Sequence, residues 1–178
     1  AGGWQTAEQV SDGSDDQQYP QIALDSSDNI HIAWMAYVTA MANNQVVYRK
    51  KTGAVWGSQE AITNTGFEQG WGLSISISAD DIVNVVWSGQ GWGANPTKYS
   101  IQYRRRVNGI WSPAQNNLVN EAKYNYLATS LWARYPSSNI LAVGYAFIYV
   151  SENTLSDLEF YSGLYVAGLG YSQAHIIG

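Results

Sequence analysis

The sequence predicts an all-β protein made of repeated, four-stranded antiparallel units. Three observations support this: a short phrase opened by an aromatic residue recurs four times, three β-like segments recur between the copies, and no stretch offers a convincing helical face. The phrase starts at Trp4, Trp56, Trp111 and Tyr171, so its copies are spaced by 52, 55 and 60 residues. A period in this range indicates repeated supersecondary units.

Each interval contains three short segments rich in β-branched or aromatic residues and bounded by Asn, Asp, Ser and Gly, as strands are. The first segments are 20–24, 73–77 and 126–131, the second are 30–34, 82–87 and 140–145, and the third are 46–49, 101–104 and 158–161. Trp34 and Trp87 lie 53 residues apart, and Tyr48 and Tyr103 lie 55 apart, so independent markers keep one register. The aromatic phrase supplies a fourth strand to each repeat.

Four-stranded antiparallel units of this period are typical of β-propeller blades. The segment Ile82–Trp87 favours blades stacked face to face, because it is apolar at nearly every position, as in a strand buried on both faces. A β-sandwich also has many short strands and is the alternative fold. We therefore expect one propeller-like domain over 1–178, with repeats at about 11–63, 64–119 and 120–178 and an extra outer strand at 1–10.

The stretches Asp25–Trp34 and Val47–Trp56 resemble blades of sialidase-like propellers with BNR (Asp-box) repeats. In that family a Ser-x-Asp-x-Gly-x-x-Trp turn joins the third and fourth strands of a blade. Gly53 and Trp56 match the Gly and Trp of this motif. The resemblance covers nearly the whole chain and implies the propeller fold.

The motif itself is degenerate. Its departures are Arg49 and Lys51 in place of Ser and Asp, Asn108 in place of Gly in the second repeat, and Tyr171 in place of Trp in the third. The arginine triad, Tyr and Glu of sialidases cannot be matched to this chain residue by residue. The resemblance therefore supports the fold more than any activity.

Composition narrows the classes of function. The 178 residues are 46% hydrophobic and 13% charged, with 8 Trp and 13 Tyr, which indicates a globular protein unusually rich in aromatics. Without cysteine the chain has neither a disulfide framework nor a thiolate zinc site. The lack of a long apolar run argues against a membrane span, and a net charge of −5 argues against nucleic acid. We expect a secreted or surface-displayed module, since Ala1-Gly2-Gly3 suits the start of a processed chain.

Long connections gather at one end of the predicted units. They are 11–19, 35–44, 65–72 and 88–98, whereas tight turns such as 26–29 and 52–53 fall at the opposite end. Long loops at one end of a rigid scaffold are the usual place for binding.

Two of these loops contain the same tetrapeptide, Gln-Gly-Trp-Gly, at 69–72 and 90–93. A Trp between two glycines has few neighbours to bury it, so its indole can stack on a pyranose while polar groups bond the sugar hydroxyls. The alternative is that each Trp plugs the end of the propeller or lies in a subunit contact. The predicted ligand-binding residues are Trp71, Trp92, Gln69, Gln90, Phe67 and Asp15.

These observations predict non-catalytic recognition of a glycan or another cell-surface or matrix polymer. A structural protein that assembles into an oligomer or a virion or cell-surface filament is the second class, and a sialidase-type glycoside hydrolase is the third. The carboxylates available for a glycosidase pair are Asp15, Asp16, Glu68, Asp80 and Asp81, all in loops or turns where acidic residues are common. We expect no catalytic residues, no metal and no cofactor.

Three further features have ordinary structural interpretations. His31 and His175 are expected to be satisfied structural histidines and not a metal pair. Ser11–Asp16 is expected to be a solvated turn, because it lacks the later Glu of a calcium loop. The basic run Arg104–Arg106 is expected at a solvated strand edge and not in a phosphate site.

The blade count predicts association. Propellers close with about 4 to 8 blades, whereas this sequence has three full sets of segments and four aromatic phrases. Open blade faces and an unpaired strand at 4–10 would expose apolar surface and a sheet edge. Either these residues belong to a longer polypeptide, or identical chains complete one another, as a two-chain ring of six blades or as a head-to-tail fibre.

Overall fold

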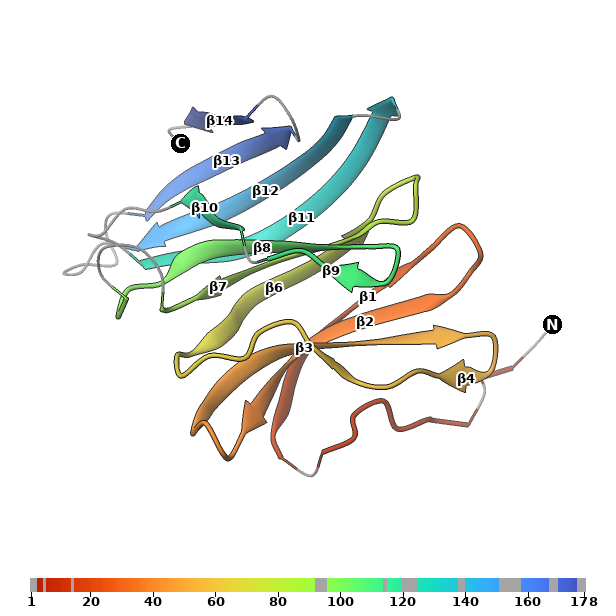
Figure 1. The fold of residues 1–178 in the computed structure, drawn as a ribbon. Helices are drawn as coiled ribbons and strands as arrows, with labels where there is room; N and C mark the ends of the chain where they lie inside the picture. The colour runs from red at the N-terminus through yellow and green to blue at the C-terminus, as the bar shows by residue number, and fades with distance from the viewer. Residues whose placement is uncertain are drawn as a thin grey trace.

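The computed structural model describes residues 3–4, 6–13, 15–91 and 96–113 in full. It describes 115–119, 125–137, 140–150, 158–166 and 170–175 as strand backbone. Within these ranges every regular element is a β-strand and every strand pair is antiparallel (Figure 1). The prediction of an all-β fold is confirmed, and these residues include no helix long and apolar enough to span a membrane.

The strands form three sheets in chain order. The first sheet contains β1 (Gln17–Leu24), β2 (Ile30–Val38), β3 (Asn43–Thr52), β4 (Val55–Trp56) and β5 (Glu60–Ala61). The second contains β6 (Gln69–Ile77), β7 (Val83–Gly89), β8 (Ser100–Val107), β9 (Ile110–Trp111) and β10 (Gln115–Val119). The third contains β11 (Asn125–Ser137), β12 (Ile140–Val150), β13 (Leu158–Val166) and β14 (Gly170–His175). Successive strands joined by short turns are antiparallel neighbours, whereas β5 pairs with β3 and β10 pairs with β8.

The second sheet lies between the other two (Figure 1). Strand β6 contacts β1, β2 and β3 on one side and β11 on the other. Strand β7 is buried at every position, as the apolar run Ile82–Trp87 predicts for a strand covered on both faces.

The core between the first two sheets is built by strand alternation. Ala33, Val46 and Tyr48 of the first sheet pack against Leu73, Ile75, Val83, Val85 and Trp87 of the second. Burial of each Val, Leu or Ile among them contributes about 1.5–3 kcal/mol. The intervening residues Asn84, Val86 and Ser88 point to the other face of β7, where β11 covers them.

The first two sheets are equivalent in detail. The Trp34 indole N–H donates to Gln17 Oε1, and the Trp87 indole N–H donates to Gln69 Oε1. In both sheets a buried polar residue of the second strand also bonds a buried Tyr of the third. These pairs are His31 with Tyr48, at 2.7 Å, and Asn84 with Tyr103, at 2.6 Å.

The segment 4–10 is expected to be an unpaired outer strand: its described residues do pair with no sheet, but they do not form a regular strand. Both edges of β3 are already occupied, by β2 on one side and by β4 and β5 on the other. The segment instead runs along the first sheet on the side away from the second (Figure 1). Side chains hold it there, with the Lys51 ammonium donating to the Glu8 carboxylate.

Several expected boundaries also change, and two show why. The connection expected at 35–44 shortens to 39–42, because β2 extends to Val38 and β3 begins at Asn43. The last segment expected at 158–161 continues to Val166 as β13. Long antiparallel pairing with β12, from Val150 to Ala142, accounts for the extension.

Candidate functional site

The connections at 11–16, 39–42, 62–68, 90–91 and 96–99 lie at one end of the first two sheets, which we call the loop end. Four exposed aromatic residues lie near this end: Tyr19, Tyr37, Phe67 and Trp71. Among the described residues, Trp4 is the only other large aromatic with comparable exposure. Exposed aromatic residues are therefore concentrated at the end of the sheets where the sequence predicts a binding surface.

Trp71 lies within β6 and not in the loop that the sequence predicts. The strand is irregular here, since its register with β7 shifts on both sides of Trp71. Gly70 and Gly72 have φ of 100° and 58°, in the region that favours glycine. This backbone turns the indole outward, leaving it 38% exposed, with its ring centroid 5.9 Å from that of Tyr19.

Glu68 fixes the polar edge of this aromatic pair. Its carboxylate accepts from the Asn44 backbone N–H at 3.0 Å and from the Asn44 side-chain amide at 2.6 Å. It also accepts from the Trp71 indole N–H at 3.2 Å. Burial and the neighbouring Glu68 charge raise the pKa of Tyr99, while a hydrogen bond with Trp71 lowers it in part. Glu68 therefore joins the start of β3 to the start of β6 and orients the indole.

The other predicted ligand-binding residues are distributed differently. Gln69 is fully buried, and its amide bonds Trp87 and the backbone oxygens of Phe67 and Gln90, which leaves it no surface for a ligand. Gln90 is partly buried and donates to the Thr97 carbonyl. Phe67 is exposed and lies against Gly91. Asp15 is exposed and accepts from the Thr39 hydroxyl, whereas Trp92 lies outside the described residues.

The opposite end of the sheets, which we call the turn end, carries a buried polar chain. His31 Nε2 donates to Asp25 Oδ2 at 3.0 Å, and the Tyr48 hydroxyl donates to His31 Nδ1. Burial lowers the pKa of His31, and the Asp25 carboxylate raises it only in part. Burial raises the pKa of Asp25, but hydrogen bonds from Lys50, Asn29 and His31 outweigh it and hold that pKa far below its usual range.

This chain borders a polar cleft of about 500 Å³ between the first two sheets. Asp81 lies on the other side and accepts from the Ser26 backbone N–H and hydroxyl at 2.7 and 2.6 Å. The carboxylates considered for a glycosidase pair are therefore divided. Asp15, Asp16 and Glu68 lie at the loop end, and Asp80 and Asp81 at the turn end.

The structural interpretation of His31 is confirmed, since both ring nitrogens bond protein groups. The described residues hold no group of three His, Cys, Asp or Glu that could bind a metal. The solvated edge expected for the basic run is wrong for Arg104 and Arg106. Arg104 donates to the carbonyls of Ile62 and Ser112, and Arg106 forms a bidentate pair with Glu60. The physical reason is strand alternation, which turns both guanidinium groups towards the first sheet.

Sequence reasoning missed Tyr19 and Tyr37 and gave Glu68 no orienting role. Tyr19 has φ of 53° at a register shift in β1, and this irregularity has no obvious signal in the sequence. Asn44 and Glu68 are 24 residues apart, so their pairing depends on how the sheets stack.

Comparison with known proteins adds no assignment to this site. No family model matches the chain, and no curated protein matches it. The resemblance to sialidase-like propellers therefore stays a prediction.

Proposed function

We propose that this chain is a non-catalytic recognition module that binds a glycan at the loop end. The observation that carries the proposal is the exposed Trp71 indole, oriented by Glu68 and flanked by Tyr19. Aromatic faces bury the apolar face of a pyranose, while nearby amide and carboxylate groups bond its hydroxyls. A surface-displayed or secreted location accords with such a ligand.

A propeller-like architecture forms part of the same proposal. In each of the three sheets the first three strands are consecutive antiparallel neighbours, and the sheets stack face to face in chain order. A sandwich has two such layers, whereas blades of a propeller continue the stack around an axis. Contacts of β6 with both β1 and β11 support the propeller, because the first strands of successive blades lie nearest that axis.

The hydrogen bonds that Glu68 accepts support recognition without catalysis. A glycosidase needs two carboxyl groups placed on either side of the scissile bond. Glu68 already accepts hydrogen bonds from Asn44 and Trp71, which favours an orienting role. Hydrolysis of a sialoside or another glycoside by the purified chain would contradict this part of the proposal.

A glycan array tests the recognition proposal. We expect Trp71→Ala to weaken binding on the order of 30-fold, the effect of losing a central aromatic contact worth about 2 kcal/mol. Trp71→Phe keeps an aromatic face and should retain more of the affinity. Ile110→Ala changes an exposed apolar residue at the turn end and serves as the matched control. The proposal fails if no glycan binds, or if folded Trp71→Ala binds as wild type does.

A further inference from the structure

One face of the first sheet carries apolar side chains that none of the described sheets covers. Its members are Ile22 and Leu24 of β1 and Ile30, Ile32 and Trp34 of β2, which cross-strand register places on the same side. Ile22 is 64% exposed and Leu24 is 56% exposed. We call this surface the open face.

The second sheet shows what this face is built to contact. Ile22 pairs with Ile32 across β1 and β2, and Ile75 pairs with Val85 across β6 and β7 in the equivalent register. Ile75 is only 8% exposed, because the first sheet packs on it. The same position is thus buried by a preceding sheet in the second repeat and exposed in the first.

Contacts of the segment 8–10 make the equivalence stronger. Glu60 and Ile62, which follow the first sheet's β4, reach across to the second sheet: Glu60 accepts from Arg106 and the Trp111 indole, and the Ile62 carbonyl accepts from Arg104. The first sheet repeats this set with one residue of each kind. The repeated contacts are Glu8 with Lys51 and the Trp56 indole, and the Val10 carbonyl with Arg49.

Residues 8–10 therefore occupy, on the first sheet, the place that residues 60–62 occupy on the second. Residues 60–62 belong to the outer strand region of the sheet that covers the second sheet. The position of residues 8–10 thus marks where the outer strand of a covering sheet lies. Among the residues that the structure describes, no further strand continues that sheet over the open face.

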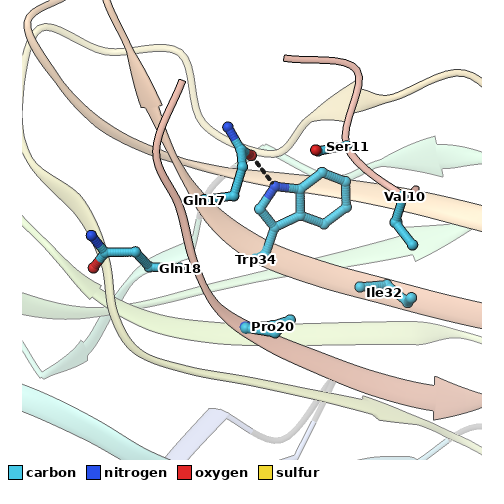
Figure 2. Close-up of a pocket in the computed structure, with 7 residues that line it drawn as sticks. All are labelled: Val10, Ser11, Gln17, Gln18, Pro20, Ile32 and Trp34. Atoms are coloured by element: carbon cyan, nitrogen blue, oxygen red, sulfur yellow. Dashed lines mark hydrogen bonds between the residues drawn. The ribbon is translucent and has the colours of Figure 1, made fainter. Parts of the chain in front are cut away.

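Figure 2 shows the hollow that remains. It measures about 270 Å³, with Trp34 on its floor and Val10, Pro20 and Ile32 around it. The Trp34 indole N–H is satisfied by Gln17, as the Trp87 N–H is by Gln69, so the polar atom needs no further partner. Ser11, Gln17 and Gln18 also line the hollow, but its surface is mainly apolar, which fits the side chains of another sheet.

The stack itself indicates which sheet that is. The second sheet presents its Trp87 face to the first sheet, and its opposite face to the third. Unlike faces therefore meet, with β11 against β6 in the place that β6 takes against β1. Such a heterologous contact repeats head to tail when a further copy is added.

We propose that the open face binds the third sheet of a second copy of this chain, and that two copies close head to tail into one ring of six sheets. Six lies within the about 4 to 8 units with which closed stacks of this kind are formed. Residues 8–10 of one copy then lie beside the third sheet of the other. The contact is independent of the glycan proposed at the loop end.

Light scattering after size exclusion tests this at micromolar concentration. We expect wild type to be a dimer and Ile22→Glu to be a monomer, with dissociation at least about 100-fold easier, because a charge would be buried against apolar residues. Ile22 is exposed in the single chain, so the variant should keep its circular dichroism spectrum. Leu24→Glu provides a second variant on the open face.

Ile110→Glu is the matched control, since Ile110 is 74% exposed and belongs to β9 of the second sheet. It should remain a dimer. A monomeric wild type would overturn the proposal and leave the open face to another partner. A dimer unaffected by Ile22→Glu and Leu24→Glu would overturn the choice of surface, and polymers lost in both variants would support the surface and overturn closure at two copies.

Discussion

Residues 8–10 and residues 60–62 make the same contacts in different surroundings. Glu60 lies between two sheets, where it accepts from Arg106 and Trp111. Glu8 accepts from Lys51 and Trp56 on a surface that no sheet of the described residues covers. Hydrogen bonds from Lys51 and then Trp56 lower the pKa of Glu8, although its carboxylate lies at the surface.

The two tryptophans show what a covering sheet adds. Trp111 meets Tyr48 of the preceding sheet edge to face, with ring centroids 5.2 Å apart. Trp56 has Lys51 and Arg49 over its ring, at 5.5 and 6.0 Å from the centroid. The polar contact is thus a local property of the repeated phrase, whereas the aromatic contact requires the neighbouring sheet.

The comparison predicts its largest effect for a pair of equivalent isoleucines. Ile75→Ala should lower the free energy of unfolding by about 2–5 kcal/mol, because it leaves a cavity between packed sheets. Ile22→Ala should change it by less than about 0.5 kcal/mol in the monomer, as exposed substitutions do. Urea unfolding of both variants at a concentration where wild type is monomeric measures the difference. Equal losses would show that the open face is already covered within one chain.

The next largest effect concerns the two glutamates. Glu60→Ala should cost about 1–3 kcal/mol, since it leaves Arg106 and the Trp111 N–H without their partly buried acceptor. Glu8→Ala should shift the urea midpoint less, because water can replace the lost carboxylate. A larger shift for Glu8 than for Glu60 would reverse the order that burial implies. Glu60→Gln, which keeps an acceptor, is the control and should recover part of the loss.

Much of the fold could be predicted because local patterns in the sequence determine the strands and turns. Alternation, β-branched residues and Asn, Asp and Gly at turns mark the strands, and the unbroken apolar run marks β7 as buried on both faces. The place of His31 in a buried strand also predicts that protein groups satisfy the hydrogen bonds of its ring nitrogens. The order of the strands alone was enough to predict that Trp71 lies at the loop end.

What escaped prediction depends on contacts between segments far apart in the chain. The sequence predicts Gln69 at the binding surface. Gln69 is buried instead, because its side-chain oxygen is the acceptor for the buried Trp87 indole N–H. The sequence predicts that Arg104 and Arg106 are solvated. In the structure the first sheet supplies their acceptors, the Ile62 carbonyl and the Glu60 carboxylate. Such partners, 42 and 46 residues distant, are set by stacking, which no local pattern records.

A third prediction concerns the buried pairs His31–Tyr48 and Asn84–Tyr103, which should differ in how they make the free energy of unfolding depend on pH. Burial lowers the pKa of His31 below its ordinary value of 6.5, so the unfolded chain binds more protons there and stability falls as pH drops below about 6.5. One such proton contributes a slope of at most about 1.4 kcal/mol per pH unit. His31→Asn, which copies the second repeat, should flatten this slope in denaturant titrations between pH 7 and 5.

The pH window separates His31 from the carboxylates. The pKa of Asp25 is lowered from 3.8 and that of Glu8 from 4.5, so their contributions are present above those ordinary values and are lost only in more acid solution. His31→Asn therefore leaves acid unfolding below these values in place. A wild-type slope unchanged by His31→Asn would mean that folding does not lower the pKa of His31.

The smallest effect is expected where the two repeats reach one backbone shape with different residues. Gly53 has φ of 57° in the turn between β3 and β4, and Asn108 has φ of 49° in the turn between β8 and β9. Asn is the non-glycine residue that adopts this left-handed region most readily, so Gly53→Asn should change the free energy of unfolding by less than about 0.5 kcal/mol. Gly53→Val should cost about 1–2 kcal/mol from backbone strain alone, because a Cβ at Gly53 meets nothing within 4 Å. Urea midpoints measure both variants, and a neutral Gly53→Val would show that this turn adopts another conformation in solution.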